Sequence, residues 1–383
     1  MRPGSGGRAG RRLPGRLTFW RRRVLALGCF AALGIAIWAG FGDGTSNGTS
    51  DATQASKLSV RELAGERLVA GFSGPTPPGK LVDMIRRGDV AGVILFTENL
   101  GARRHARRLI GRLQRIDRPP GLRHPLLVMI DQEGGLVKRL DGPPNVSAQV
   151  MGRRGAAYSR RQGAKTARNL RDVGVNVDLA PVLDVGRRGS AIRAEHRSFG
   201  SRPRRVIDTA IPFATAMQSH GVAATAKHFP GLGAAPENTD FAVQRIRLRR
   251  STLRRIDERP YGPFAKRGGD MVMLSTAIYP HLSPRPAAFS ARVATGELRE
   301  RVGFAGVSIS DASESVSARS FGGPARVARA AARAGTDLVL FTDYRDAARG
   351  GRALRRALRE GKLEHEGFEE SAQRVLDLRE RLP

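Results

Sequence analysis

The sequence carries acidic and basic side chains of the kinds that would suit chemistry on a sugar. Carboxylates and cations bind sugar hydroxyls through paired hydrogen bonds, while one ionised carboxylate can attack an anomeric carbon and a second acid can protonate the leaving oxygen. Taken alone, each such residue is better explained as the start of a loop or as a surface ion pair, so the fold must gather them. The candidates directly follow short apolar runs or close them: Asp131, Asp184, Lys227, His228, Thr276 and Asp311.

These apolar runs predict the elements that would position the polar residues. From residue 58 onward, eight runs alternate with longer amphipathic stretches, which is typical of parallel strands buried on both faces and separated by helices. A doubly wound open sheet would also fit. The polar residues at the ends of the runs favour a single (β/α)8 TIM-type barrel, because the carboxyl ends of all eight strands then surround one site. The predicted strands are 68–72, 90–96, 126–130, 175–185, 222–229, 271–276, 306–311 and 336–342.

The positive charge of the chain does not indicate a nucleic-acid-binding protein. The sequence has 66 Lys plus Arg against 35 Asp plus Glu, a formal net charge of +31, and the cations are spread along the chain. The most basic stretch, 103–115, places Leu109, Ile110 and Leu113 on one side of a helix and its Arg residues on the other, as in a helix at the surface of a barrel. Only four Tyr and two Trp are available to stack on bases. We predict no nucleic-acid partner.

Metal and cofactor chemistry find little support in the sequence. Cys29 is the only cysteine, which excludes disulfide scaffolds and Cys-based metal sites. The His residues other than His228 show no metal-ligand spacing with one another or with Cys29. The sequence also lacks the G-x-x-x-x-G-K-[ST] phosphate loop and the H-E-x-x-H pair. We predict no metal and no cofactor.

The first sixty residues are typical of a membrane anchor and spacer. Residues 1–23 contain eight Arg and no acid, 24–41 carry no charge, and 42–57 are rich in Gly, Ser and Thr. A bilayer is crossed by about 20 apolar residues and a basic flank stays in the cytoplasm, so we predict a cytoplasmic flank, a transmembrane helix, a flexible linker and an extracytoplasmic domain, 58–383. Secretion after cleavage of a signal peptide is the alternative. The positive charge beyond the anchor would attract an anionic cell-wall polymer.

Six segments, in this order, resemble glycoside hydrolase family 3, specifically its single-domain branch of bacterial β-N-acetylglucosaminidases. The resemblance implies a TIM-type barrel acting as a retaining hydrolase on β-linked N-acetylglucosaminides of cell-wall-type glycans. DQEGG and KHFPG are the most specific parts. The segments are VMIDQEGGLVKRL (128–140), GVNVDLAPVLDV (174–185), HRSFG (196–200), AKHFPGLG (226–233), MVMLSTAIYP (271–280) and GFAGVSISDAS (303–313).

The resemblance also assigns roles to single residues. It implies that Asp311 is the nucleophile, and four of the six residues that it selects already stand at predicted strand ends. It adds Arg139 and Arg197 to them. The residues expected to hold the sugar hydroxyls are Asp131, Arg139, Arg197, Lys227 and His228.

One part of the family pattern is changed in this chain. That branch carries an Asp-x-His acid/base pair eleven and thirteen residues after the lysine of KHFPG, where this sequence has Asn238 and Asp240. Proton transfer to the leaving group contributes roughly 10²–10⁴ in rate, so the change matters. Asp240, or as the weaker candidate Glu237, would supply the proton from a carboxyl whose pKa is raised by enclosure. Alternatively, the barrel binds cell-wall sugars without hydrolysing them, or it favours phosphate or another sugar over water as the acceptor.

Two smaller departures lie beside the expected site. Leu136 stands where members commonly carry Arg, which removes a cation from the rim, and Ala312 replaces the Asp that often follows the nucleophile. The nucleophile itself is kept at Asp311. We therefore favour an active or weakly active retaining hydrolase over a sugar-binding barrel that has lost activity.

Overall fold

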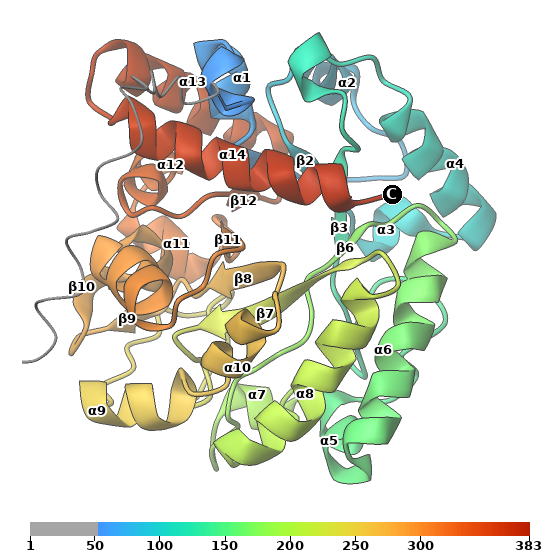
Figure 1. The fold of residues 1–383 in the computed structure, drawn as a ribbon, viewed down its shortest axis with the longest axis vertical. Helices are drawn as coiled ribbons and strands as arrows, with labels where there is room; N and C mark the ends of the chain where they lie inside the picture. The colour runs from blue at the N-terminus through green and yellow to red at the C-terminus, as the bar shows by residue number, and fades with distance from the viewer. Residues whose placement is uncertain (1–52) are drawn as a thin grey trace, which may run out of the picture. The chain divides into compact units, whose positions relative to one another are not determined.

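Eight short apolar strands form one closed parallel barrel in the computed structural model, which describes residues 53–383 (Figure 1). Neighbouring strands pair in parallel around the sheet, β12 pairs with β1, and a parallel bridge between Ile309 and Leu338 closes the ring. The barrel is thereby confirmed and the open sheet is excluded. Every strand lies within one of the eight predicted runs: β1 (Leu68–Ala70), β2 (Gly92–Ile94), β3 (Leu127–Ile130), β6 (Val177–Asp178), β7 (Ala223–Phe229), β8 (Met271–Leu274), β11 (Val307–Ser310) and β12 (Val339–Phe341).

Burial on both faces explains why the strands read as continuous apolar runs. In β3, Leu127 and Met129 belong to the apolar cluster inside the barrel, whereas Val128 and Ile130 belong to the larger cluster between the barrel and its helices. Successive side chains of a strand point to opposite faces, so both sets must be apolar when both faces are covered.

Helices in the connections cover the outside of the barrel (Figure 1). Helix α4, the Arg-rich stretch, buries Leu109, Ile110 and Leu113, as predicted for a surface helix. The helices are α1 (Val60–Gly65), α2 (Gly79–Arg86), α3 (Thr97–Leu100), α4 (Arg103–Gln114), α5 (Ala148–Arg154), α6 (Ala156–Arg171), α7 (Ala191–Ala194), α8 (Pro203–Gln218), α9 (Arg250–Thr252), α10 (Tyr261–Lys266), α11 (Val316–Phe321), α12 (Pro324–Arg333), α13 (Tyr344–Arg359) and α14 (His365–Arg381).

Shorter elements decorate the connections. Two hairpins extend the loops after β3 and β8, and two π-helical stretches follow β7 and β8. The hairpins are β4 (Gln132–Gly134) with β5 (Val137–Lys138) and β9 (Ile278–Tyr279) with β10 (Ser283–Pro286). The π-helices are η3 (Leu253–Asp257) and η5 (Arg292–Arg301), and the 3₁₀ turns are η1 (Ala55–Lys57), η2 (Pro120–Leu122) and η4 (Ala287–Phe289).

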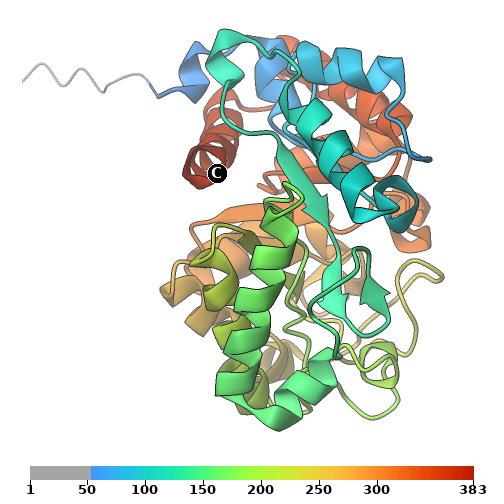
Figure 2. The same ribbon diagram turned by 90° about the vertical axis from the view of Figure 1, so that its right-hand side faces the viewer.

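Helix α14 closes the amino end of the barrel. Its Val375 and Leu378 join the interior apolar cluster. The buried guanidinium of Arg379 pairs with Glu66 and donates hydrogen bonds to backbone carbonyls in the segment that leads into β3. In Figure 2, α14 (red) lies on the opposite side of the barrel from hairpin β4–β5. The carboxyl ends of the strands are thus left to the loops.

The predicted membrane anchor is not tested by this structure. Among residues 53–383, no helix is both long and apolar enough to cross a bilayer. The basic flank 1–23, the apolar segment 24–41 and the linker up to residue 52 lie outside the described residues. The anchor, the linker, the domain start at residue 58 and the localisation therefore stay predictions.

Candidate active site

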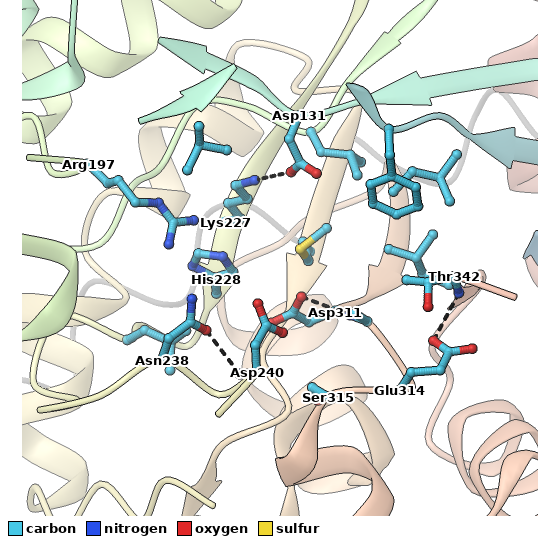
Figure 3. Close-up of a pocket in the computed structure, with 18 of the residues that line it drawn as sticks. Asp131, Arg197, Lys227, His228, Asn238, Asp240, Asp311, Glu314, Ser315 and Thr342 are labelled. Atoms are coloured by element: carbon cyan, nitrogen blue, oxygen red, sulfur yellow. Dashed lines mark hydrogen bonds and ion pairs between the residues drawn. The ribbon is translucent and has the colours of Figure 1, made fainter. Parts of the chain in front are cut away.

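A cavity of about 740 Å³ lies at the carboxyl end of the barrel, within the loops that follow the strands (Figure 3). It brings together residues that are widely separated in sequence, as expected when the ends of parallel strands converge. All eight residues selected from the sequence line it: Asp131, Arg139, Arg197, Lys227, His228, Glu237, Asp240 and Asp311.

One wall of the cavity is a network of buried charges. Nζ of Lys227, at the end of β7, lies 2.7 Å from Oδ1 of Asp131 and 2.7 Å from Oε1 of Glu133. Arg197 donates two hydrogen bonds of 2.8 Å to the two carboxylate oxygens of Glu133. Asp131 also lies 3.8 Å from Arg139, so a chain of alternating charges runs along this wall.

The network keeps its members charged. Burial by itself raises the pKa of Glu133, but the charges and hydrogen bonds of Arg197 and Lys227 outweigh it and hold that pKa well below its usual range. Burial lowers the pKa of Lys227 and of Arg197, yet the neighbouring carboxylates reverse this and raise both. Charges of both signs therefore already face the cavity. These side chains would not need to reorganise to bind a hydroxyl-rich ligand.

The ring of His228 is oriented by Asp184, which lies outside the cavity. Its Nδ1 lies 2.7 Å from Oδ2 of Asp184, and Oδ1 of the same carboxylate accepts a hydrogen bond of 2.7 Å from the backbone N–H of Leu232. The carboxylate fixes the donor hydrogen on Nδ1 and leaves Nε2 for a ligand. Asp184 and Thr276, both of which stand at predicted strand ends, are buried and do not line the cavity. Their part is to support its wall.

The opposite wall carries the two carboxylates expected to act on the bond. Asp311 follows β11, and its Oδ1 accepts a hydrogen bond of 2.8 Å from the backbone N–H of Ala312. In Figure 3 the carboxyl group of Asp240 points toward that of Asp311. Burial in the cavity, followed by the charge of Asp311, raises the pKa of Asp240 to about 6, although His228 and Arg197 oppose this. Asp240 can therefore hold a proton close to neutral pH.

The loop that carries Asp240 is bound to the start of helix α11. The first N–H groups of a helix have no partner within the helix. Here the N–H of Val316 donates to the carbonyl of Asp240 (3.4 Å) and that of Ser317 to the carbonyl of Thr239 (3.2 Å). Asn238 accepts a hydrogen bond of 3.0 Å from the N–H of Asp240 through its side chain. These contacts hold Asp240 beside the residue expected to be the nucleophile.

Three further carboxyl groups belong to the site and escaped the sequence analysis. Glu133 lies in β4, two residues after Asp131, and pairs with Arg197 and Lys227 behind the cavity wall. Glu314 lines the cavity, accepts a hydrogen bond from the N–H of Thr342, and has its pKa raised by burial. Asp178 accepts from the N–H of Gln132, and burial raises its pKa to about 8.

Comparison with known proteins decides the family. Residues 62–378 match the Glycosyl hydrolase family 3 N terminal domain. The chain belongs to glycosyl hydrolase family 3. A fungal relative, an uncharacterized secreted glycosyl hydrolase of Arthroderma benhamiae, is 36% identical over 86% of this chain and 96% of its own length. A beta-hexosaminidase of Xylella fastidiosa is 35% identical over 71% of this chain and 82% of its own length.

Solved structures of the family share the fold. A family 3 beta-N-acetylglucosaminidase from Paenibacillus is 31% identical, with a TM-score of 0.80 over 85% of this chain, which spans 62% of the length of that protein. A beta-N-acetylhexosaminidase from Beutenbergia cavernae is 28% identical, with a TM-score of 0.77 over 84% of this chain and 98% of its own. The family and the barrel expected from the sequence are both confirmed.

Proposed function

We propose that this barrel hydrolyses β-linked N-acetylglucosaminides with retention of configuration, with Asp311 as the nucleophile and Asp240 as the acid/base. The main support is that the Asp240 carboxyl, with its pKa raised to about 6, points toward Asp311 within the cavity (Figure 3). The names of relatives such as the Xylella beta-hexosaminidase support the substrate class.

In the first step, Asp311 attacks the anomeric carbon while Asp240 donates its proton to the glycosidic oxygen. The bond between that oxygen and the anomeric carbon breaks, the aglycone leaves as a neutral alcohol, and the sugar is joined to Asp311 as an ester. Before this step, the charged wall around Lys227 and Arg197 would hold the sugar hydroxyls in place.

In the second step, Asp240 acts as a base. The ester no longer carries the charge of Asp311, so one of the causes of the raised pKa of Asp240 is removed and its carboxyl ionises more readily. The carboxylate then takes a proton from a water molecule whose oxygen attacks the anomeric carbon, and the bond between that carbon and the Asp311 oxygen breaks. The sugar leaves with its configuration retained, and both carboxyl groups return to their starting states.

Binding without hydrolysis is the second candidate, and the Asn238–Thr239–Asp240 sequence favours it because the family's Asp-x-His pair is absent. In either case, we propose cell-wall-type glycans as ligands and an extracytoplasmic barrel, held at the membrane by residues 24–41 or secreted. These two points rest on the sequence and on the resemblance described above. Attraction of the Arg-rich surface to an anionic wall polymer belongs to the same proposal.

An assay with the full-length chain separates the two candidates. A 4-nitrophenyl β-N-acetylglucosaminide should release nitrophenol with the wild type and only at background rate with Asp311→Asn. A 2-fluoro sugar with an activated leaving group should leave a covalent adduct that mass spectrometry locates on Asp311. If both proteins release nitrophenol at background rate while the wild type still binds the sugar, the binding candidate replaces the enzyme. Repeating the assay with added phosphate and looking for a sugar phosphate tests the changed acceptor.

A further inference from the structure

The most exposed large apolar side chains of residues 53–383 are all found on the loops at the carboxyl end of the barrel. They are Leu136 and Phe241, each 73% exposed, Val316 at 44% and Val243 at 38%. Isolated exposed apolar residues are ordinary, whereas a set confined to the surroundings of one cavity marks a binding surface. We call these four residues the apolar rim.

The apolar rim is tied to the residues of the proposed chemistry. Leu136 lies in the turn of hairpin β4–β5 and lines the cavity itself. Phe241 directly follows Asp240, and the N–H of Val316 donates a hydrogen bond to the carbonyl of Asp240. Hairpin β4–β5 and the yellow loop after β7 project from the same end of the barrel (Figure 2). The apolar rim therefore lies directly beside Asp240, the proposed proton donor.

The two ends of the cavity differ in what they can bind. The wall of Lys227, Asp131 and Arg197 offers charges to hydroxyl groups, as a sugar ring requires. Asp240 must touch the leaving oxygen to protonate it, so the group attached to that oxygen lies beside Asp240, which Phe241 follows in the sequence and to whose carbonyl Val316 is hydrogen-bonded. The rim residues offer hydrocarbon there, and two further loop residues that line the cavity, Glu237 and Glu314, carry carboxyls rather than cations.

We propose that the apolar rim binds an apolar aglycone, so that glycosides whose leaving group is an alkyl or aryl alcohol are substrates in addition to the cell-wall-type glycans proposed above. This inference rests on the proposed function, because it assumes that Asp240 faces the leaving oxygen. A second charged sugar would gain no ion pair from the rim residues. A hydrocarbon chain would cover them and remove apolar surface from water on both sides.

A pair of alkyl glycosides isolates this effect. Methyl and octyl β-N-acetylglucosaminide have the same sugar and leaving alcohols of similar acidity, so they differ mainly in apolar area. Each methylene group moved out of water is worth roughly a fourfold change in affinity. The wild-type kcat/KM should therefore be at least about tenfold higher for octyl, even if only two or three methylene groups reach the rim. The double variant Leu136→Ser with Phe241→Ser should bring this ratio close to one.

Two controls make the ratio interpretable. Arg204→Ser changes a strongly exposed side chain on α8, far from these loops in sequence, and should keep the wild-type ratio. Thermal unfolding of each variant shows that the fold is kept, which is expected because Leu136 and Phe241 are exposed. The corresponding octyl and methyl thioglycosides resist hydrolysis, so calorimetry can measure their dissociation constants. The ratio of these two constants should show the same preference for octyl.

The outcomes separate this inference from the proposed function. Hydrolysis or binding of both glycosides with a ratio near one in the wild type overturns the apolar aglycone and leaves the glycosidase proposal standing. A high ratio that survives the double variant also overturns it. If neither glycoside is hydrolysed but the thioglycosides show the ratio, the aglycone site stands without the enzyme; if nothing binds, both proposals fail. A wild-type dimer that the double variant splits, with the ratio unchanged, would assign the rim to contact between two copies.

Discussion

The two walls of the cavity use the same type of side chain in opposite ways. On one wall, the carboxyl of Glu133 lies between Arg197 and Lys227, and these cations hold its pKa far below the usual range. On the other wall, the carboxyl of Asp240 faces the like charge of Asp311, and burial together with that charge raises its pKa to about 6. The same functional group is thus held as an anion on one side and can hold a proton near neutral pH on the other.

In the proposed function, ligand binding and proton transfer therefore depend on separate parts of the fold. The charged wall comes from the barrel strands and from residues packed against them, where a buried ion persists only if it is paired. The proposed acid, Asp240, lies on a loop. It can hold a proton near neutral pH because it is poorly paired with cations. On this proposal, a change in the loop, such as the Asn238 and Asp240 of this chain, can alter the chemistry while the charged wall is kept.

Removing Glu133 should have the largest effect on stability, because it leaves two buried cations with fewer partners. We expect Glu133→Ala to lower the free energy of unfolding by about 3 kcal/mol, the low end for a broken buried ion pair, since Arg197 keeps Glu195 and Lys227 keeps Asp131. Urea unfolding followed by circular dichroism measures this. A loss below about 0.5 kcal/mol, the range of ordinary surface substitutions, would show that the wall does not depend on this pairing.

Changing Asp240 should spare stability and remove proton transfer. We expect Asp240→Asn to lower kcat/KM for alkyl glycosides by roughly 10²–10⁴, and much less for the 4-nitrophenyl glycoside, whose leaving group needs little protonation. Steady-state kinetics on both substrates provides the test. Equal losses on the two would make Asp240 a structural loop residue and remove the contrast between the walls.

The pH dependence of kcat/KM should also distinguish the carboxyl groups of the two walls, Asp240 and Glu133, while substrate binding stays unchanged. Asp240 acts in its protonated form, so for alkyl glycosides we expect kcat/KM to fall about tenfold for each pH unit above the pKa of about 6. The carboxylate of Glu133, with its lowered pKa, stays ionised throughout this range. Asp240→Asn should lose the alkaline limb. A limb that persists in this variant would belong to another group.

Glu237 should give the smallest effect. It lies on the same loop, lines the same cavity and is exposed like Asp240, but it is Asp240 whose carboxyl points toward Asp311 (Figure 3). We expect Glu237→Gln to change kcat/KM for alkyl glycosides less than about twofold, which makes it a matched control for Asp240→Asn. If Glu237→Gln gives the large loss instead, the acid has been assigned to the wrong residue of the loop.

The sequence predicts the barrel well because its strands are buried on both faces. Runs such as 126–130 and 271–274 had to be apolar throughout, and the polar residues that follow them mark the carboxyl ends. The alternation alone does not distinguish a closed ring from an open sheet. That distinction depends on β12 pairing with β1 and on the bridge between Ile309 and Leu338, which join residues far apart in the chain.

The site was predictable to the extent that its residues stand at strand ends or in the family motifs. Lys227, His228 and Asp311 satisfy both conditions. Glu133 was missed because Asp131 already marks that strand end and no rule selects the second carboxylate of DQEGG. The position of Asp240 over Asp311 depends on hydrogen bonds between the loop and the first turn of α11, and local sequence patterns carry no information about such contacts.

The hydrogen bonds at the start of α11 provide a way to measure the opening of the loop that carries Asp240. The amide hydrogens of Val316 and Ser317 are held by carbonyls of the loop that carries Asp240, rather than by their own helix. Each time the loop lifts away, these two hydrogens become free to exchange with solvent, while amides deeper in α11 stay bonded within the helix. Deuterium uptake at these two positions therefore follows loop opening directly, and a glycan that seals the cavity should slow it at both positions together.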